Sequence, residues 1–362
     1  MSRRVIVLLV LVSALSGCGH PLVPAPAPAT ARAPQRLTAA DSDPAPLVIG
    51  ANGPVLGINL YALRNYPPAQ VEADGTRMLS YIRNVLDAGA VDIVWNFYSP
   101  GFYANTVNAT SATLTAANVA ILVGLARQDH LLVEFRPLIM IDGDHPWEGH
   151  IEPTDPGLWF SHYYDLELPY LRVAQQYGIS EFVAATEMSG LNDSAYWPAF
   201  FARIGGIYHG VVSYAAYEND YFPPGTQLLG VPYVGVDMYE PLSLPASASA
   251  AQVTAAYESF FSRLPAALLR RTAIDETGIQ ARAGAYQGPS FLYIPGSLDE
   301  AVQANWFTAA CATVKKYDMR AVFIWKVDLT DYPITHPAPS LSTFEGKAGA
   351  LAISRCGSIL DS

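Results

Sequence analysis

Short apolar segments recur along the chain and alternate with longer segments of helical periodicity. The apolar segments are rich in Val, Ile, Tyr and Phe, and most are apolar at nearly every position, which is typical of parallel strands buried on both faces. The predicted strands are, in chain order, Val55–Ala62, Val91–Tyr98, Leu132–Met140, Glu181–Met188, Val211–Tyr217, Leu229–Tyr239, Thr272–Gly278 and Ala321–Asp328.

The segments between these strands predict helices. Thr76–Ala88 carries an apolar stripe, and Asp155–Tyr177 opens with a capping Asp and a Pro, with Pro169 expected to kink it. Asp299–Tyr317 predicts a third helix. Strands alternating with helices over about 280 residues predict an α/β fold, a single (β/α)8 TIM barrel. An open doubly wound sheet is less consistent, because no Gly-rich phosphate loop follows the first strand.

The N-terminal residues have the composition of an export signal. Arg3 and Arg4 precede an apolar run over residues 5–15, which is too short to cross a bilayer comfortably. The run ends in Leu-Ser-Gly-Cys, which resembles the bacterial lipobox and places the lipidated cysteine at Cys18. An ordinary signal peptide with an incidental cysteine is the alternative. We expect residues 1–18 to be a lipoprotein signal peptide, and the protein to be anchored on the outer face of the cell membrane or secreted.

A linker and one folded domain are expected to follow this signal. Residues 19–47 alternate Pro with small residues, a composition that stays extended and solvated. Residues 48–362 then form a single domain, since the chain is 51% hydrophobic and only 15% charged. The net charge of -11 argues against nucleic acid or anionic membranes as partners, so membrane contact is expected through the lipid alone. We expect a monomer.

Two cysteines remain once Cys18 is assigned to the lipid. Outside the cytoplasm Cys311 and Cys356 can form a disulfide, while two buried free thiols are equally consistent with the sequence.

Two predicted strands end in a glutamate. The active site of a TIM barrel lies at the carboxyl ends of its strands, where Glu187 follows the fourth strand and Glu276 the seventh. Cleavage of a glycosidic bond needs such a pair, one carboxyl protonated and the other ionised. The alternative is that both pair with basic residues inside the barrel, for which Arg136 is the main candidate. Asp275 would point away from Glu276 in a regular strand, so we expect it to be structural.

Several motifs then occur in an order that resembles a known family. They are Phe-Arg-Pro at 135–137, Trp-Glu-Gly-His-Ile-Glu-Pro at 147–153, Trp-Phe at 159–160, Thr-Glu-Met-Ser at 186–189, Trp197, Gly210–Tyr214, Gly-Val-Asp-Met-Tyr-Glu-Pro-Leu at 235–242, Asp-Glu-Thr-Gly at 275–278 and Phe-Ile-Trp at 323–325. In this combination the sequence resembles glycoside hydrolase family 113, a group of clan A barrels best known as β-mannanases.

The resemblance implies a retaining hydrolase and a role for particular residues. Glu187 would be the general acid/base and Glu276 the nucleophile. Tyr239 is similar to a tyrosine that donates a hydrogen bond to the nucleophile. Trp325 would form the floor under the reacting sugar, with ordinary core packing as the alternative. Thr186 stands where many clan A enzymes have Asn, which leaves the identity of the sugar open.

Other residues near the predicted mouth are candidates for substrate contact. Trp147 could stack on a sugar ring, as could the aromatic residues Trp95, Tyr98, Tyr103 and Trp159, for each of which packing is the alternative.

Among polar residues, Asn59 and Asn96 end the first two strands and could bind hydroxyl groups, and Arg136 is a further candidate. Glu148 occupies a position where the family often has Arg, which also leaves the identity of the sugar open.

Two further readings bear on function. A histidine and aspartate cluster matches no standard zinc or calcium spacing, so we expect no metal and no cofactor; its members are Asp142, Asp144, His145, His150 and His162. We expect an exported retaining hydrolase of a β-linked, β-mannan-type saccharide. A cell-surface glycan-binding lipoprotein with a degenerate barrel is the alternative from another class.

Overall fold

The computed structural model describes residues 47–141, 147–222, 229–290, 295–331 and 343–362. The chain divides into two units, Met1–Ser42 and Asp43–Ser362, and the account below concerns the second. The predicted signal peptide with Cys18, and the predicted linker up to residue 46, lie outside the described residues. Within the described residues, no helix is both long and apolar enough to cross a membrane.

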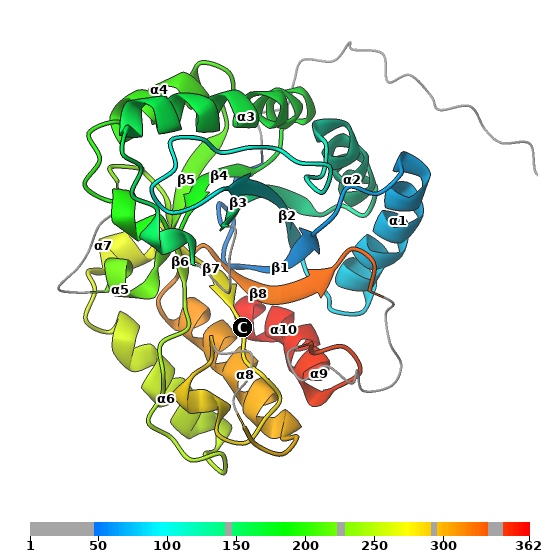
Figure 1. Ribbon diagram of the computed structural model, residues 1–362. Coiled ribbons are helices and arrows are strands. Elements are labelled where there is room, and N and C mark those ends of the chain that lie inside the picture. The colour runs from blue at the N-terminus through cyan, green and yellow to red at the C-terminus, as the bar shows by residue number, and fades with distance from the viewer. Residues whose placement is uncertain (1–46, 142–146, 223–228, 291–294, 332–342) are drawn as a thin grey trace, which may run out of the picture. The chain divides into compact units, whose positions relative to one another are not determined.

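Eight parallel strands form a closed barrel in which each strand pairs with its neighbours in chain order (Figure 1). This confirms the predicted TIM barrel. The strands are β1 (Val55–Ala62), β2 (Ala90–Ser99), β3 (Leu132–Ile141), β4 (Glu181–Thr186), β5 (Val211–Tyr217), β6 (Val234–Asp237), β7 (Thr272–Thr277) and β8 (Ala321–Asp328).

Helices surround the barrel on its outer side (Figure 1). They are α1 (Pro68–Asn84), α2 (Ala116–Gln128), α3 (Pro156–Tyr177), α4 (Trp197–Gly205), α5 (Glu218–Tyr221), α6 (Ala250–Phe261), α7 (Ala266–Leu269), α8 (Glu300–Lys316), α9 (Ala348–Ser354) and α10 (Cys356–Asp361), with short 3-10 turns η1 (Glu148–His150), η2 (Ser189–Leu191) and η3 (Ala285–Gln287).

The helix bounds follow local capping chemistry. The Asp155 side chain accepts a hydrogen bond from the amide of Leu158, and α3 ends where Gly178 turns left-handed with φ 57°. Pro169 lies inside this helix. α1 begins eight residues before the predicted start at Thr76, because Pro68 at its first position fixes a helical φ.

Among the strands that are shorter than predicted, β6 and β4 are shortened for a backbone reason. β6 begins at Val234 rather than Leu229, since Leu229 and Gly230 are left-handed, with φ of 48° and 74°, which an extended strand cannot include. β4 likewise ends at Thr186, because Glu187 has φ 50°. The catalytic candidate therefore stands on a turn immediately after its strand.

The strand residues that face outward build the hydrophobic core with the helices. Trp95 stacks on Tyr170 of α3 with ring centroids 4.4 Å apart, and Phe97 and Phe135 pack edge-on against it. Trp95 and Trp159 have no exposed surface, so packing rather than substrate contact accounts for both. Tyr103, in contrast, is 66% exposed.

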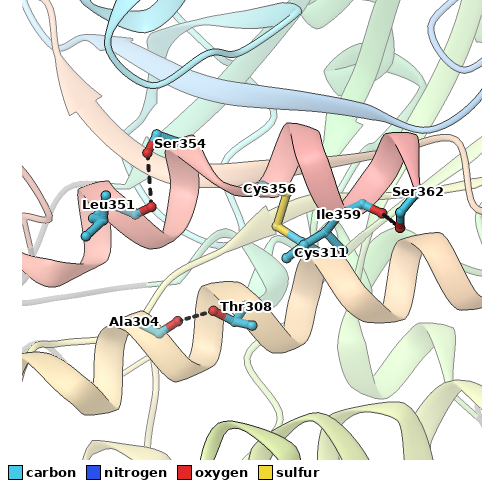
Figure 2. The surroundings of a disulfide bond; sticks show 8 residues. All are labelled: Ala304, Thr308, Cys311, Leu351, Ser354, Cys356, Ile359 and Ser362. Atoms are coloured by element: carbon cyan, nitrogen blue, oxygen red, sulfur yellow. Dashed lines mark hydrogen bonds between the residues drawn. A yellow bond between two sulfur atoms is a disulfide. The ribbon is translucent and has the colours of Figure 1, made fainter.

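The C-terminal helices are joined to the barrel by a disulfide. Figure 2 shows the bond between Cys311 in the middle of α8 and Cys356 at the start of α10, with α9 and α10 lying along α8. Both cysteines are fully buried, and 45 positions separate them in the sequence. The bond closes a large loop that includes the whole of β8.

Candidate active site

The two candidate carboxylates stand at the carboxyl ends of β4 and β7. The amide of Glu187 donates to the carbonyl of Ala215 on β5 at 2.8 Å, which ties the left-handed turn to the neighbouring strand. A left-handed conformation costs free energy for a residue other than glycine, and such residues concentrate at functional sites. Glu276 is the penultimate residue of β7 and is 8% exposed.

Hydrogen-bond donors surround the carboxylate of Glu276. The Tyr61 hydroxyl donates to Oε1 at 2.6 Å, and the Tyr239 hydroxyl donates to Oε2 at 3.1 Å, the contact that the family resemblance implied. The Arg136 guanidinium lies 3.6 Å from Oε1. Two donors and a cation around one carboxyl suit a group that carries its charge before it attacks.

Tyr61 was not among the residues predicted from the sequence. The signal was present: side chains two apart on a strand share a face, and Tyr61 is two residues after Asn59, which had been selected. Trp325 on β8 completes this side of the mouth, because its indole N–H donates to the Tyr61 hydroxyl at 3.1 Å. The Trp325–Lys326 peptide bond is cis.

Glu187 has a different environment. Burial raises the pKa of its carboxyl well above the ordinary value, and the negative charges of Asp237, Glu148 and Glu276 raise it further. The indole N–H of Trp147 donates to Oε2 and is the opposing influence. A raised pKa favours the protonated carboxyl, which is the state a general acid needs.

Trp147 is held in one position by its neighbours. Its ring lies 4.6 Å from the ring of Tyr217 and 5.1 Å from that of His150. Gly149 leaves room for the indole, because a Cβ at that position would lie 2.3 Å from the ring. Trp147 was predicted to stack on sugar, which stays a prediction, and the structure shows that it contacts the acid/base candidate directly.

A polar layer fills the barrel beneath Glu276. The Arg136 guanidinium lies within 4 Å of five carboxyl groups, at 2.9 Å from Asp92, 3.2 Å from Asp237, 3.6 Å from Asp275, 3.6 Å from Glu276 and 3.8 Å from Glu134. One positive charge cannot balance five negative ones at this depth. Burial accordingly raises the pKa of Asp92 to about 6 and that of Asp275 to about 8, so part of the layer is protonated at neutral pH.

This layer corrects two of the substrate-contact predictions. Arg136 has no exposed surface and is occupied by carboxyl groups, so it supports Glu276 rather than the sugar. Asn59 is also fully buried, and its amide donates to Asp92 at 2.8 Å and to the carbonyl of Asp275 at 3.1 Å. Both side chains are buried within the polar layer, which leaves neither exposed to a ligand in this conformation.

The predicted orientation of Asp275 is wrong. It was expected to point away from Glu276, yet both carboxyls lie 3.6 Å from the Arg136 guanidinium. The pairing of β7 with both of its neighbours shifts register at this point, so two consecutive side chains face the interior. Asp275 is fully buried, as a structural residue would be.

Two other candidates, Asn96 and Thr186, have buried side-chain oxygens. Asn96 is 5% exposed and Thr186 is 2% exposed, and neither the Asn96 Oδ1 nor the Thr186 Oγ1 has a hydrogen-bond partner among the described residues. Both oxygens are themselves buried, so they are closed to a ligand in this conformation, and substrate contact by Asn96 and Thr186 stays a prediction.

The metal reading finds no support in the described part of the chain. No group of three or more His, Cys, Asp or Glu there could hold a metal ion. Asp142, Asp144 and His145, three members of the cluster considered above, lie outside the described residues.

Comparisons with known proteins point in one direction. Residues 92–342 match the model of a family described as Glycoside Hydrolase Family 113. A solved β-1,4-mannanase of that family, determined as a complex, is 15% identical with a TM-score of 0.70, covering 84% of this chain and 98% of its own. The β-mannanase AaManA of Alicyclobacillus acidocaldarius, in complex with ManMIm, is 18% identical with a TM-score of 0.69, covering 86% of this chain and 99% of its own.

A more distant structure is the family 5 mannosidase of Rhizomucor miehei in complex with mannosyl-fructose. It is 12% identical with a TM-score of 0.57, covering 87% of this chain and 97% of its own. A comparison with curated protein sequences gave no match. At these identities the solved structures show a shared fold.

Proposed function

The chain belongs to glycoside hydrolase family 113 and is a retaining glycoside hydrolase, and we propose that it cleaves a β-mannan with Glu276 as the nucleophile and Glu187 as the general acid/base. The observation that carries the assignment is the contrast between the two carboxyls. Glu276 accepts two hydrogen bonds beside a guanidinium, whereas burial and three negative charges raise the pKa of Glu187.

In the first half-reaction, a Glu276 oxygen attacks the anomeric carbon and the bond to the leaving oxygen breaks. Glu187 gives its proton to that oxygen, which departs as a hydroxyl group of the leaving sugar. A glycosyl ester on Glu276 remains, and Glu187 is now a carboxylate.

In the second half-reaction, Glu187 takes a proton from a water molecule, whose oxygen attacks the same carbon as the ester bond to Glu276 breaks. Two inversions restore the β configuration, and both carboxyls return to their starting states. This chemistry predicts a separation of about 5–5.5 Å between the two carboxyl groups.

The choice of mannan rests on the named relatives, and aromatic side chains at the mouth support a sugar substrate. Two family 113 relatives are β-mannanases. Trp147 and Trp325 offer partly exposed aromatic faces beside the two carboxyls, and such faces suit the apolar face of a sugar ring.

A substrate screen tests this proposal. Purified protein from about residue 45 onward is incubated with mannan, glucan, galactan and arabinan, and reducing ends are measured. We expect release from mannan, with the β anomer formed first in proton NMR spectra. Release from a different polymer alone would overturn the substrate, and a first-formed α anomer would overturn the double displacement.

We also propose that the protein is exported and anchored through a lipid on Cys18. The support is the short apolar run that ends in Leu-Ser-Gly-Cys, followed by Pro-rich sequence. The wild-type protein should partition with membranes, and Cys18→Ala should release it into the soluble fraction. Membrane retention unchanged in that variant would place the anchor elsewhere.

A further inference from the structure

A hollow lies on the rim of the barrel, between the loops that follow β3 and β4. We call it the rim pocket; its volume is about 260 Å³. One wall is the loop between β3 and α3, with Glu152, Pro153 and Pro156, and the other is the loop between β4 and α4, residues 190–191 and 193–196. The helices that follow these loops, α3 and α4, lie side by side outside the barrel (Figure 1).

The walls of the rim pocket are fixed by close packing. A Cβ on Gly190 would lie 2.4 Å from the carbonyl oxygen of Ile151, so only glycine lets the two loops meet there. The indole of Trp197, which is almost fully buried, donates to the carbonyl of Leu191 at 2.8 Å and closes the second loop on itself. The pocket is therefore built before any ligand arrives.

Tyr196 presents an aromatic face at this pocket. One side of its ring stacks on Phe160, with centroids 5.8 Å apart and an angle of 22° between the planes. Gly157 sets its position, because a Cβ there would lie 2.9 Å from the Tyr196 hydroxyl. The side chain is nevertheless 47% exposed. A large aromatic residue held rigidly with half its surface in water is suited to stacking on a ligand.

A second exposed aromatic residue lies next to the same wall. Tyr103 is 66% exposed, and its carbonyl accepts a hydrogen bond from the amide of Thr154, two residues before Pro156. Tyr103 and Asn105 lie in the loop between β2 and α2. The Asn105 side chain accepts a hydrogen bond from the amide of Asp155 at 2.7 Å, which connects this loop to the wall of the pocket. Aromatic surface thus extends beyond the rim pocket along the edge of the barrel.

We infer that the rim pocket is a carbohydrate subsite that binds a sugar unit on the leaving-group side of the substrate, with Tyr196 as its stacking face. A pyranose ring combines an apolar C–H face with hydroxyls at its edge, and the pocket offers an aromatic face with the exposed carboxylates of Glu152 and Asp193. The inference rests on the proposed function.

The position of the rim pocket in the polypeptide chain indicates on which side of the cleaved bond it lies. Glu187 protonates the leaving oxygen, so the departing part of the substrate lies on the Glu187 side. The rim pocket is lined by the loop that begins directly after Glu187, at Gly190–Leu191 and Asp193–Tyr196. The proposed path of the departing sugars therefore runs from Glu187 towards the rim pocket.

The test compares substrates of different length on four proteins. Wild type, Tyr196→Ala, Tyr196→Phe and Leu351→Ala are assayed on mannohexaose and on a nitrophenyl β-mannobioside, whose leaving group is too short to reach the pocket. Leu351 is a matched control, since it is 51% exposed but lies on α9.

We expect Tyr196→Ala to raise KM for mannohexaose by about 2- to 10-fold, the range for loss of one stacking contact, with kcat and the aryl substrate unchanged. Tyr196→Phe keeps the ring and should behave as wild type, as should Leu351→Ala. Equal KM values for wild type and Tyr196→Ala would overturn the subsite and leave the proposed function intact. An equal rise in KM on both substrates would also overturn the subsite, because it would show that Tyr196 supports the fold and does not bind the leaving group. A wild-type protein that cleaves neither substrate would overturn the proposed function and the subsite with it.

Discussion

The hydrogen bond from Trp147 to Glu187 partly offsets the rise that burial causes in the pKa of the acid/base. Trp147→Phe removes the indole N–H while a ring of similar shape can still pack between Tyr217 and His150. The donor stabilises the ionised form of Glu187, so its loss should raise the pKa of this carboxyl further above its ordinary value.

The magnitude follows from the kind of bond. A hydrogen bond to a charged group contributes about 1.5–3 kcal/mol, and 1.36 kcal/mol corresponds to one pH unit, so the lower end predicts a rise of about one unit. The alkaline limb of the kcat/KM profile reports the proton on Glu187 in the free enzyme and should move to higher pH by that amount. Deglycosylation needs Glu187 as a base, and should slow at a fixed pH below the new limb.

Steady-state rates on mannohexaose, whose leaving sugar needs the proton from Glu187, measure both effects across the pH range. Trp306→Phe is the matched control, because its indole donates to the neutral hydroxyl of Thr277 at 2.8 Å and its removal leaves no titrating group without a donor. A limb that stays in place in Trp147→Phe, or moves to lower pH, would refute the role of the indole in setting the proton on Glu187.

Three other results are expected. Tyr61→Phe should lower kcat/KM about 10-fold or more in steady-state assays, since it removes a donor to the charged nucleophile; an unchanged value would contradict that role. Replacing Cys311 and Cys356 by Ser should lower the free energy of unfolding in urea by about 4 kcal/mol, the chain-entropy value for a loop of this length, and an equal midpoint would refute it. Because burial raises the pKa of Asp92 to about 6 and of Asp275 to about 8, the stability that their protonation gives should be complete below about pH 4 and lost as pH rises to about 8; thermal melting that rises over this range would contradict the protonated layer.

The sequence predicted the barrel because parallel strands buried on both faces are continuously apolar. That pattern identified all eight strands and placed Glu187 and Glu276 at their carboxyl ends. It could not show depth along the barrel axis. Asn59 and Arg136 face the interior, as substrate contacts would, but each stands several residues below its strand end.

Local backbone geometry could not be predicted from the apolar pattern of the strands either. The register shift that turns Asp275 inward depends on pairing with both neighbours of β7. The left-handed turn at Glu187 depends on a hydrogen bond to β5. The contact between Trp147 and Glu187 joins loops 40 positions apart, and no periodicity of either segment encodes it.

The division of labour between Glu187 and Glu276 is the central claim, and azide rescue tests it most directly. Without the acid/base, an aryl mannoside with a good leaving group still forms the glycosyl ester, and azide attacks it from the β face. Without the nucleophile no ester forms, and azide attacks the substrate itself from the opposite face. NMR of the products should therefore show the β-mannosyl azide from Glu187→Ala and the α-mannosyl azide from Glu276→Ala. The α product from Glu187→Ala with the β product from Glu276→Ala would reverse the two roles, and full activity in either variant without azide would contradict the assignment.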